Sequence, residues 1–538
     1  MRKFLEEKIR EAIGALQSES VLPDFEVPEI RLEYPKDEQH GEYATSAALA
    51  CAKGARMKPM ELAELIRDRL DIPECERIEV APPGYVNFRI SLEAFGSMLA
   101  DIDVLGARYG DGEEGEGKRV NNEFVSANPT GPLHLGNGRG GFFGDSLSRV
   151  LRKAGYAVTS EYYVNDGGEQ VLKLGHSVLR DEEAVYGGTY LEELARALET
   201  DGPEPAEGED LVRTVGVWAA EEVMNRHIRP SLSEKMGIFY DSFVSERVDI
   251  VEAGLSERAM NVFRGKGLLF EREGATWLRT TDFSDDKDRV LVKSDGTHTY
   301  FLNDCGYLLR KIEGGADRLV LTLGADHHGY VGRLRAAAEA LGFSGRFDIF
   351  VVQLVRLMKD GKEVRMSKRA GNVVSIDELV ELVGHDVTRF FFLMYSPDTH
   401  MNFDLGLAEE RSEKNPVYYV QYAHARLSSI LRKAEEAGLE PDMTYPELLT
   451  HSKERALLRE LLIFPELISD IAESGAVHHM PQYAIRLADR LHSFYADCRV
   501  IDEEHPERSG ARLGLVSAVR TVLSETLRLI GVEALERM

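Results

Sequence analysis

The sequence predicts a multidomain α/β protein with an N-terminal α+β domain, a doubly wound parallel-sheet domain carrying an insertion, and a C-terminal all-α helical bundle. Strand-like and helix-like runs alternate through the middle of the chain, which is typical of a parallel sheet covered by helices. No convincing strand pattern follows residue 415. At 538 residues the chain is also too long for a single hydrophobic core. We therefore place three domains at residues 1–110, 118–410 and 411–538.

The first domain combines helical periodicity with short strand patterns. The supporting runs are residues 4–16, 44–51 and 61–70 for helices, and 78–81 and 85–90 for strands. A Gly-rich acidic stretch at 111–118 follows and is typical of a linker.

A buried-strand pattern at 120–126 opens the central domain. Pro129 and Pro132 stop that strand and stiffen the turn after it. Helical spacing begins at Gly138. The intervening loop therefore delivers free backbone N–H groups and the positive end of a helix dipole to one place, which favours an anion.

The same loop contains a misleading pattern. Gly136, Gly138 and Gly141 match G-x-G-x-x-G, and Glu161 lies about twenty residues further on, as in dinucleotide-binding folds. In those folds the first glycine follows the strand directly, whereas a long Pro-containing loop intervenes here. A dinucleotide site is therefore disfavoured.

The sheet pattern continues on both sides of a long interruption. A strand at 156–164 comes first, and strands resume at 318–323 and 349–354. We interpret residues from about 178 to 290 as an insertion, because their acidic, turn-rich part suits a surface. Ligands of doubly wound sheets bind beyond the carboxyl ends of the strands.

The last domain is a bundle of four expected helices. They cover residues 418–437, 454–474, 483–500 and 512–530.

Composition excludes several classes of protein. Hydrophobic content of 43% and charged content of 29% are ordinary, and no apolar run is long enough to span a membrane. The acid-rich N-terminus argues against a targeting segment, so a cytoplasmic location is expected. The four cysteines are scattered without a C-x-x-C pair, so neither a zinc site nor a disulfide framework is expected. A net charge of −27 is unfavourable for a nucleic-acid partner, although local basic strips can still bind RNA.

A second motif, read together with the loop before Gly138, indicates a protein family. Residues 364–372 read Val-Arg-Met-Ser-Lys-Arg-Ala-Gly-Asn, a basic loop before a helix that starts near Ser375. Together with His-Leu-Gly-Asn at 134–137, this loop resembles the paired signature motifs of class I aminoacyl-tRNA synthetases. Further segments narrow the resemblance to arginyl-tRNA synthetases of bacterial type, over nearly the whole chain. They are Glu-Phe-Val-Ser-Ala-Asn-Pro-Thr-Gly from 123, Gly-Ala-Asp-His-His-Gly-Tyr from 324, and Asn-Pro-Val-Tyr-Tyr-Val-Gln-Tyr-Ala-His-Ala-Arg from 415.

This resemblance implies a Rossmann-like catalytic domain, an additional N-terminal domain that contacts tRNA, and an anticodon-binding bundle. It implies that arginine is activated by ATP, with tRNA bound, and is then transferred to the 3′ end of tRNA(Arg). The family pattern also suggests a monomer.

The implied chemistry needs alignment of the substrates and stabilisation of phosphate charge. His134 and Asn137 from the first motif, and Arg365 and Lys368 from the second, would carry it. The implied ATP contacts are Gly136, His134, Asn137, Asp326, His327, Met366, Ser367 and Lys368. Mg²⁺ would bridge the phosphate oxygens.

Two departures from the family motifs bear on rate rather than reaction type. Asn137 stands where the family has a second histidine, and Arg365 and Arg369 replace a lysine and a serine. Each replacement keeps a hydrogen-bond donor. The alternatives are that His134 only caps a helix and that Lys368 is a solvated surface charge.

The amino-acid pocket is the more specific expectation, because a guanidinium is always charged and prefers planar carboxylates. Glu123 and Asp304 match the family's guanidinium-binding carboxylates, and Tyr300 matches its pocket tyrosine. Ser126 and Asn128 are placed to hold the α-amino and carboxylate groups. The alternative for Asp304 is a helix N-cap.

Two regions are expected to contact tRNA. In the first domain Asn87 and Phe88 suit an unpaired base. In the bundle the candidates are Tyr418, Gln421, Tyr422 and Arg426. Because an aromatic stripe at helical spacing is usually core, we expect roughly half of this group, with Tyr419, to be buried.

Three other functions compete with an arginine–tRNA ligase. A cysteine-specific class I synthetase would need clustered zinc-ligand cysteines near its pocket. A small-molecule nucleotidyltransferase with a similar first motif would not need the long helical bundle. A non-catalytic tRNA-binding paralogue would be expected to have lost residues of the motif loops, which are retained here.

Overall fold

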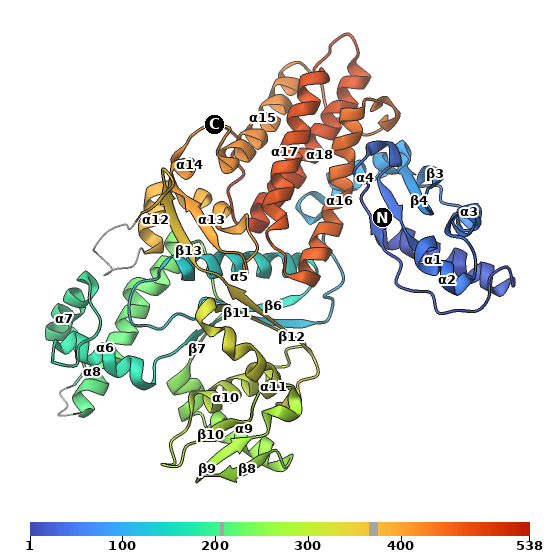
Figure 1. Ribbon diagram of the computed structural model, residues 1–538. Helices are drawn as coiled ribbons and strands as arrows, with labels where there is room; N and C mark the ends of the chain where they lie inside the picture. The colour runs from blue at the N-terminus through green and yellow to red at the C-terminus, as the bar shows by residue number, and fades with distance from the viewer. Residues whose placement is uncertain (205–208, 365–374) are drawn as a thin grey trace.

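The computed structural model describes residues 1–204, 209–364 and 375–538. It contains a central parallel sheet, a helical bundle above it, a small N-terminal domain beside the bundle, and two groups of elements below (Figure 1). The predicted fold class is confirmed.

The N-terminal domain packs helices on a four-stranded antiparallel sheet of order β1-β2-β4-β3. Its helices are α1 (Arg2–Ser18), α2 (Ala47–Ala55), α3 (Pro59–Arg69) and α4 (Leu92–Leu105), and its strands are β1 (Leu32–Glu33), β2 (Tyr43–Thr45), β3 (Cys75–Ala81) and β4 (Tyr85–Ile90). A buried carboxylate fixes this domain to the bundle, because Glu466 accepts hydrogen bonds from the hydroxyls of Tyr34 and Tyr43 and from the backbone N–H of Arg2.

The core sheet has the order β12-β11-β5-β6-β7, with every neighbouring pair parallel. Its strands are β5 (Arg119–Glu123), β6 (Ala157–Val164), β7 (Ser242–Ser245), β11 (Arg318–Gly324) and β12 (Arg346–Val352). Since the chain moves outward from β5 to β6 and β7 on one side, and returns to β11 and β12 on the other, the winding direction switches between β5 and β11. A ligand crevice is expected at the carboxyl ends of these two strands.

The structure corrects the predicted insertion at residues 178–290. That range contains β7, which pairs in parallel with β6 as the edge of the core sheet. The excursion is therefore divided into two parts by a short core strand. The four residues of β7 are too few to give a recognisable strand pattern.

The two excursions have different architectures. Between β6 and β7 lie α6 (Gly168–Leu179), α7 (Thr189–Asp201) and α8 (Glu209–Val223). Between β7 and β11 lie the π-helix η5 (Glu246–Glu252), helices α9 (Leu255–Gly265) and α10 (Tyr300–Glu313), and an antiparallel sheet of β8 (Leu269–Arg272), β9 (Ala275–Leu278) and β10 (Arg289–Val292).

Helix α5 (Leu135–Lys153) connects β5 to β6, and α11 (Val331–Leu341) connects β11 to β12. A second small sheet follows, formed by β13 (Val355–Lys359), β14 (Lys362–Glu363) and β15 (Met401–Asp404). Helices α12 (Ile376–Val383), α13 (His385–Leu393) and α14 (Leu405–Glu409) complete the part of the chain built around the core sheet.

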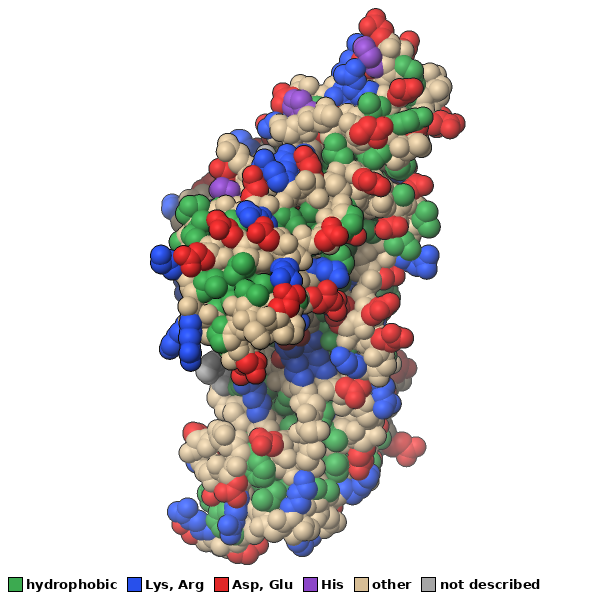
Figure 2. All heavy atoms as spheres, turned by 90° about the vertical axis from the view of Figure 1, so that its right-hand side faces the viewer, with side chains coloured by type: hydrophobic (Ala, Val, Ile, Leu, Met, Phe, Trp, Pro, Cys, Tyr) green, Lys and Arg blue, Asp and Glu red, His purple; other side chains and the backbone are tan. Residues whose placement is uncertain are grey.

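The predicted bundle is confirmed, with α15 (Pro416–Glu436), α16 (Ser452–Ser474), α17 (His479–Asp497) and α18 (Pro506–Ile530). The end of the bundle is joined to the central domain by Arg389 of α13, which is fully buried and donates to the carbonyl of Ile530 and to Asp145 of α5. On the face in Figure 2, acidic side chains are spread among basic ones, and Lys and Arg side chains gather where the surface is indented between the upper body and the lower lobe.

Candidate active site

A cleft of about 1060 Å³ opens at the carboxyl edge of the core sheet, where the winding direction switches. Its walls come from the ends of β5, β6, β11 and β12, from the loop before α5, and from α10. The cleft is therefore where the topology of a doubly wound sheet places a ligand.

The first motif caps α5. The Nδ1 atom of His134 accepts the backbone N–H groups of Gly136 and Asn137 at 3.1 and 3.3 Å, and the side-chain oxygen of Asn137 accepts the backbone N–H of His134 at 3.1 Å. An accepting Nδ1 carries no proton, so the neutral ring has its proton on Nε2. Desolvation lowers the pKa of His134 and so also favours the neutral ring, although nearby Asp326 acts in the opposite direction.

The capping alternative for His134 is thus correct, but it is compatible with a catalytic role. His134 lines the cleft, and the cap fixes a tautomer that can donate from Nε2. Asn137 fills the second position of the capping box and needs no charge for that task.

The end of the second motif loop lies against the first motif. Ser375, the N-cap of α12, forms a β-bridge with His134, and the N–H of Ile376 donates to the carbonyl of Leu133 at 3.0 Å. Gly138 makes this approach possible, since a Cβ there would lie 2.5 Å from the side chain of Ile376. The start of α12, which follows the second motif in sequence, therefore lies against the first motif. Arg365, Met366, Ser367 and Lys368 themselves lie outside the described residues.

At the opposite end of the cleft, Glu123 is already paired. Its carboxylate accepts from the ammonium of Lys311 at 2.5 Å and from the hydroxyl of Ser126 at 3.0 Å. Lys311 also lies 3.9 Å from Glu161. Although burial acts to raise it, the pKa of Glu161 is held below its ordinary value by Lys311, Arg310 and the hydroxyl of Tyr307. The protein itself therefore balances the charge of Glu123.

Asp304 and Glu246 are not balanced in this way. Both line the cleft, and among the described residues neither has an ion pair within 4.0 Å. Burial raises the pKa of Asp304 to about 7, reinforced by Glu246 and Glu123 and opposed by Arg333. Burial also raises the pKa of Glu246, which accepts a hydrogen bond from Asn303 at 2.8 Å. Two carboxylates without a cation are what a bound guanidinium would complete.

The remaining predicted pocket residues line the same cleft. Ser126 follows Val125, and both have left-handed backbones, with φ of 39° and 67°. Such values are strained for a β-branched residue and are common at functional sites. Asn128 accepts a hydrogen bond from Asn165 at 3.2 Å. Tyr300 lies half-exposed, and its hydroxyl accepts the backbone N–H of Glu169 at 3.3 Å.

Asp326 and His327 follow β11 on the side of the cleft nearer the first motif. Their side chains are 80% and 47% exposed, and a carboxylate oxygen of Asp326 lies 3.3 Å from Nε2 of His327. Both side chains are therefore accessible to a ligand, and their contact with ATP stays a prediction.

The structure contradicts the predicted base contacts in the N-terminal domain. Phe88 has no exposed surface and packs in the core of its domain, so it cannot stack on a base. Asn87 is buried, and its amide lies 3.3 Å from Nδ1 of His40. The apparent recognition pair is the interior of a strand.

The predicted tRNA contacts in the bundle differ in how exposed they are. Gln421 is buried and donates to Asp386 at 2.7 Å and to the carbonyl of Glu533 at 2.9 Å, so the structure contradicts a base contact there. Tyr422 is 44% exposed, and the guanidinium of Arg426 lies 4.0 Å from the ring centre of Tyr495. Tyr418 is half-buried. The expected burial of roughly half the group was an overestimate, since of these five residues only Gln421 is buried.

Sequence reasoning missed two residues of the pocket. Glu246 was hidden because the strand before it fell inside the supposed insertion. Lys311 was hidden because its partner Glu123 is 188 positions away. A signal for Lys311 did exist, since a lysine in the apolar stripe of a buried helix needs a partner.

The fold and the site define a class I aminoacyl-tRNA synthetase. Three family models match in chain order: the arginyl tRNA synthetase N terminal domain over residues 3–90, the tRNA synthetases class I (R) catalytic domain over 224–391, and the DALR anticodon binding domain over 420–538.

Comparisons over the whole chain give the specificity. The arginine–tRNA ligase of Bacillus subtilis is 41% identical, with 100% of this chain and 99% of that protein covered, and that of Geobacillus thermodenitrificans is equally similar. The arginyl-tRNA synthetase structure of Thermus thermophilus aligns over 100% of both chains with a TM-score of 0.79 and 25% identity. The Plasmodium falciparum enzyme shares the fold, with a TM-score of 0.78 and 15% identity over 100% of this chain and 99% of that one.

The chain belongs to the arginine–tRNA ligase family. It activates L-arginine with ATP and transfers the arginyl group to tRNA(Arg), releasing AMP and pyrophosphate. Within the described ranges, no helix combines the length and apolar character that a membrane crossing requires.

Proposed function

We propose that the guanidinium of arginine binds between Asp304 and Glu246, at the end of the cleft formed by α10 and β7. The observation that carries this proposal is that these two cleft-lining carboxylates have no cation within ion-pair distance among the described residues, and that the pKa of each is raised. A planar, permanently charged ligand supplies donors for both carboxylates. This assignment replaces Glu123, the predicted partner, with Glu246.

Glu123 then has a supporting task. Through Lys311 and Ser126 it holds the strained turn at the end of β5, which faces the main chain of the substrate. Ser126, Asn128 and Tyr300 remain the candidates for the α-amino and carboxylate groups, because their side chains line the cleft between its two ends.

ATP occupies the other end in this proposal. The Nε2–H of His134, the backbone at Gly136 and the positive end of α5 face the phosphates, while Asp326 and His327 face the ribose or adenine. Arg365 and Lys368, with Met366 and Ser367, complete this end from the second motif loop. Asn137 contributes by fixing the cap.

The first step requires little acid–base help. A carboxylate oxygen of arginine attacks the α-phosphorus, the bond to the bridging oxygen breaks, and pyrophosphate leaves. In the second step a terminal ribose hydroxyl of tRNA attacks the arginyl carbonyl, and AMP leaves. The residues above align the reactants and stabilise charge on the leaving groups.

We propose that Mg²⁺ enters with ATP. Mg²⁺ keeps several waters and binds mainly substrate phosphates with one or two carboxylates. Of the described residues, only Asp502, Glu504 and His505 form a group of three close ligating side chains, and they belong to the bundle.

The tRNA face of the bundle is proposed around Tyr418, Tyr422 and Arg426, on α15. Tyr422 stacks on His492 with ring centres 6.2 Å apart, which leaves a partly exposed aromatic platform for an unpaired base. A monomeric, cytoplasmic enzyme remains our expectation.

Exchange of pyrophosphate into ATP tests the proposed site. We expect exchange with arginine and tRNA together, and none with lysine or with citrulline, which is nearly isosteric with arginine but uncharged. Exchange with arginine alone would contradict the predicted need for tRNA. Exchange with citrulline would contradict a pocket built on two carboxylates.

A further inference from the structure

Arg139 is among the largest fully buried side chains of the protein, with 1% of its surface exposed. It lies on α5, five residues after His134. Among the described residues it has no carboxylate within 4.0 Å, and burial lowers its pKa to about 10 against a weak opposing effect of Asp398. An enclosed guanidinium without an ion pair is costly unless its donors are used.

Two of those donors hold backbone carbonyls from distant segments. Nη1 donates to the carbonyl of Gln353 and Nη2 to that of Ser396, each at 2.9 Å. The N–H of Gln353 donates in turn to the carbonyl of Pro397 at 2.8 Å. Both polar groups of the Gln353 backbone are thus fixed, one of them by Arg139.

The fixed segment forms part of the cleft. Val352, the last residue of β12, lines it at the nucleotide end together with Gln353 and Leu354, which follow the strand. Leu354 leads directly into β13 and β14, the hairpin that precedes the second motif loop. Arg139 itself does not line the cleft.

We infer that Arg139 is a positioning residue for the nucleotide: its guanidinium ties the helix of the first motif to the backbone of Gln353, which lines the cleft just before the β13–β14 hairpin. Arg139 holds the cleft-lining backbone of Gln353 in place relative to α5, and it does not touch the substrate itself. The inference rests on the proposed placement of ATP at this end of the cleft.

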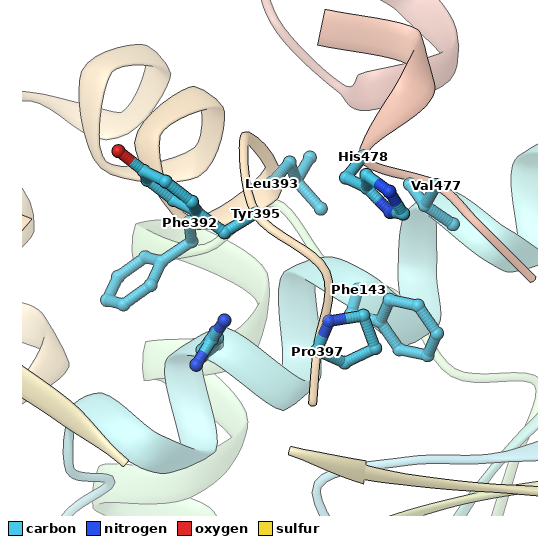
Figure 3. A pocket seen from close by; sticks show the side chains of 8 residues that line it. Phe143, Phe392, Leu393, Tyr395, Pro397, Val477 and His478 are labelled. Carbon is cyan, nitrogen blue, oxygen red and sulfur yellow. The ribbon is translucent and has the colours of Figure 1, made fainter. Parts of the chain in front are cut away.

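Arg139 also borders a small cavity of about 10 Å³. Phe143, Pro397, Val477 and His478 line the same cavity (Figure 3). Nε of Arg139 and Nδ1 of His478 are both buried without a partner among the described residues. The cavity is close to the size of one water. His478 therefore provides a matched control, since it borders the cavity but makes no hydrogen bond to the Gln353 segment.

The test compares Arg139→Met, Arg139→Lys and His478→Gln by steady-state aminoacylation and by direct arginine binding. Hydrogen bonds from a charged donor correspond to roughly a ten- to hundredfold effect. We expect KM for ATP to rise ~10- to 100-fold in Arg139→Met and less in Arg139→Lys, which keeps one donor. Arginine affinity should stay within about twofold in both, because no arginine-end residue contacts Arg139. His478→Gln should match the wild type.

Three results would overturn the inference. KM for ATP could be unchanged in folded Arg139→Met. Affinities for ATP and arginine could fall together with the melting temperature, which would make Arg139 a packing residue. His478→Gln could equal Arg139→Met, which would assign the effect to the cavity. If Arg139→Met does not fold, Arg139→Lys decides between the same outcomes. His134→Ala in parallel separates the causes, because an unchanged ATP dependence there would instead refute the placement of ATP.

Discussion

The two ends of the cleft use charge in opposite ways. At the proposed arginine end, Asp304 and Glu246 have no counter-ion among the described residues, although the protein balances neighbouring Glu123 and Glu161 with Lys311 and Arg310. At the nucleotide end, the described donors are neutral: the Nε2–H of His134, an amide, and the start of a helix.

This difference matches the two tasks. Arginine carries its positive charge before, during and after activation, so a fixed negative site can select it in the ground state. Charge on pyrophosphate grows only as it leaves, so donors there are most useful when they act on the transition state. The contrast predicts that changes at one end alter KM for arginine and changes at the other alter kcat.

The largest expected effect comes from Lys368→Ala in the second motif. Loss of one donor to developing charge commonly costs about 2.7–4 kcal/mol, so kcat should fall ~100- to 1000-fold while KM for arginine changes little. Single-turnover rates of aminoacyl-adenylate formation would measure this directly. A near-normal kcat would contradict this role and would favour the alternative that Lys368 is a solvated surface charge.

Next in size is Asp304→Asn, which keeps the shape but removes one of two unbalanced charges. Hydrogen bonds to charged groups contribute roughly 1.5–3 kcal/mol, so arginine binding should weaken by about ten- to more than a hundredfold while ATP affinity is preserved. Asp326→Asn is the matched control, an exposed aspartate at the other end that should leave arginine binding unchanged. If Asp304→Asn lowers the affinities for ATP and arginine together, Asp304 stabilises the fold and the pocket assignment is wrong.

A smaller effect is expected from Glu123→Gln, and this variant sharpens the assignment of the pocket. In this variant Lys311 still has Glu161 as a counter-ion, 3.9 Å away. The negative charge that faces the guanidinium at Asp304 and Glu246 is therefore not removed. Arginine affinity should fall by less than ~tenfold. Titration of arginine into both variants decides the matter. A loss as large as that of Asp304→Asn would restore Glu123 as a guanidinium ligand.

The sequence predicted the large features of the fold because they depend on repeated local patterns. The four bundle helices and the strands β3 and β4 lie close to their predicted positions, whereas the two- and three-residue strands β1 and β2 were not predicted. The motif helix was also predictable, because prolines and glycines mark its start. By contrast β7 is four residues long, and the excursions on both sides obscured it.

Pairing across the fold could not be predicted from local pattern. Glu123 and Glu246 are similar acidic residues in sequence, and only the position of Lys311 shows that one is neutralised and the other is not. Phe88 and Gln421 illustrate the same limit, since an aromatic ring or an amide that suits a base suits a core equally well.

The central claim, that Asp304 supplies an unbalanced charge to the guanidinium, is tested most directly by the pH dependence of arginine binding. A carboxylate with a pKa of about 7 is about one-tenth ionised at pH 6 and about nine-tenths ionised at pH 8. A bound guanidinium favours the ionised form of Asp304, so the pKa of Asp304 falls in the complex. Binding of arginine therefore releases a proton, and the affinity rises as the pH increases through 7.

Isothermal titration of arginine from pH 6 to pH 8, in buffers of different ionisation enthalpy, measures both the affinity and the number of protons released. The account predicts a gain of ~tenfold in affinity over this range, with proton release greatest at the lower pH and absent in Asp304→Asn. An affinity independent of pH in the wild type, or a pH dependence that persists unchanged in Asp304→Asn, would contradict it.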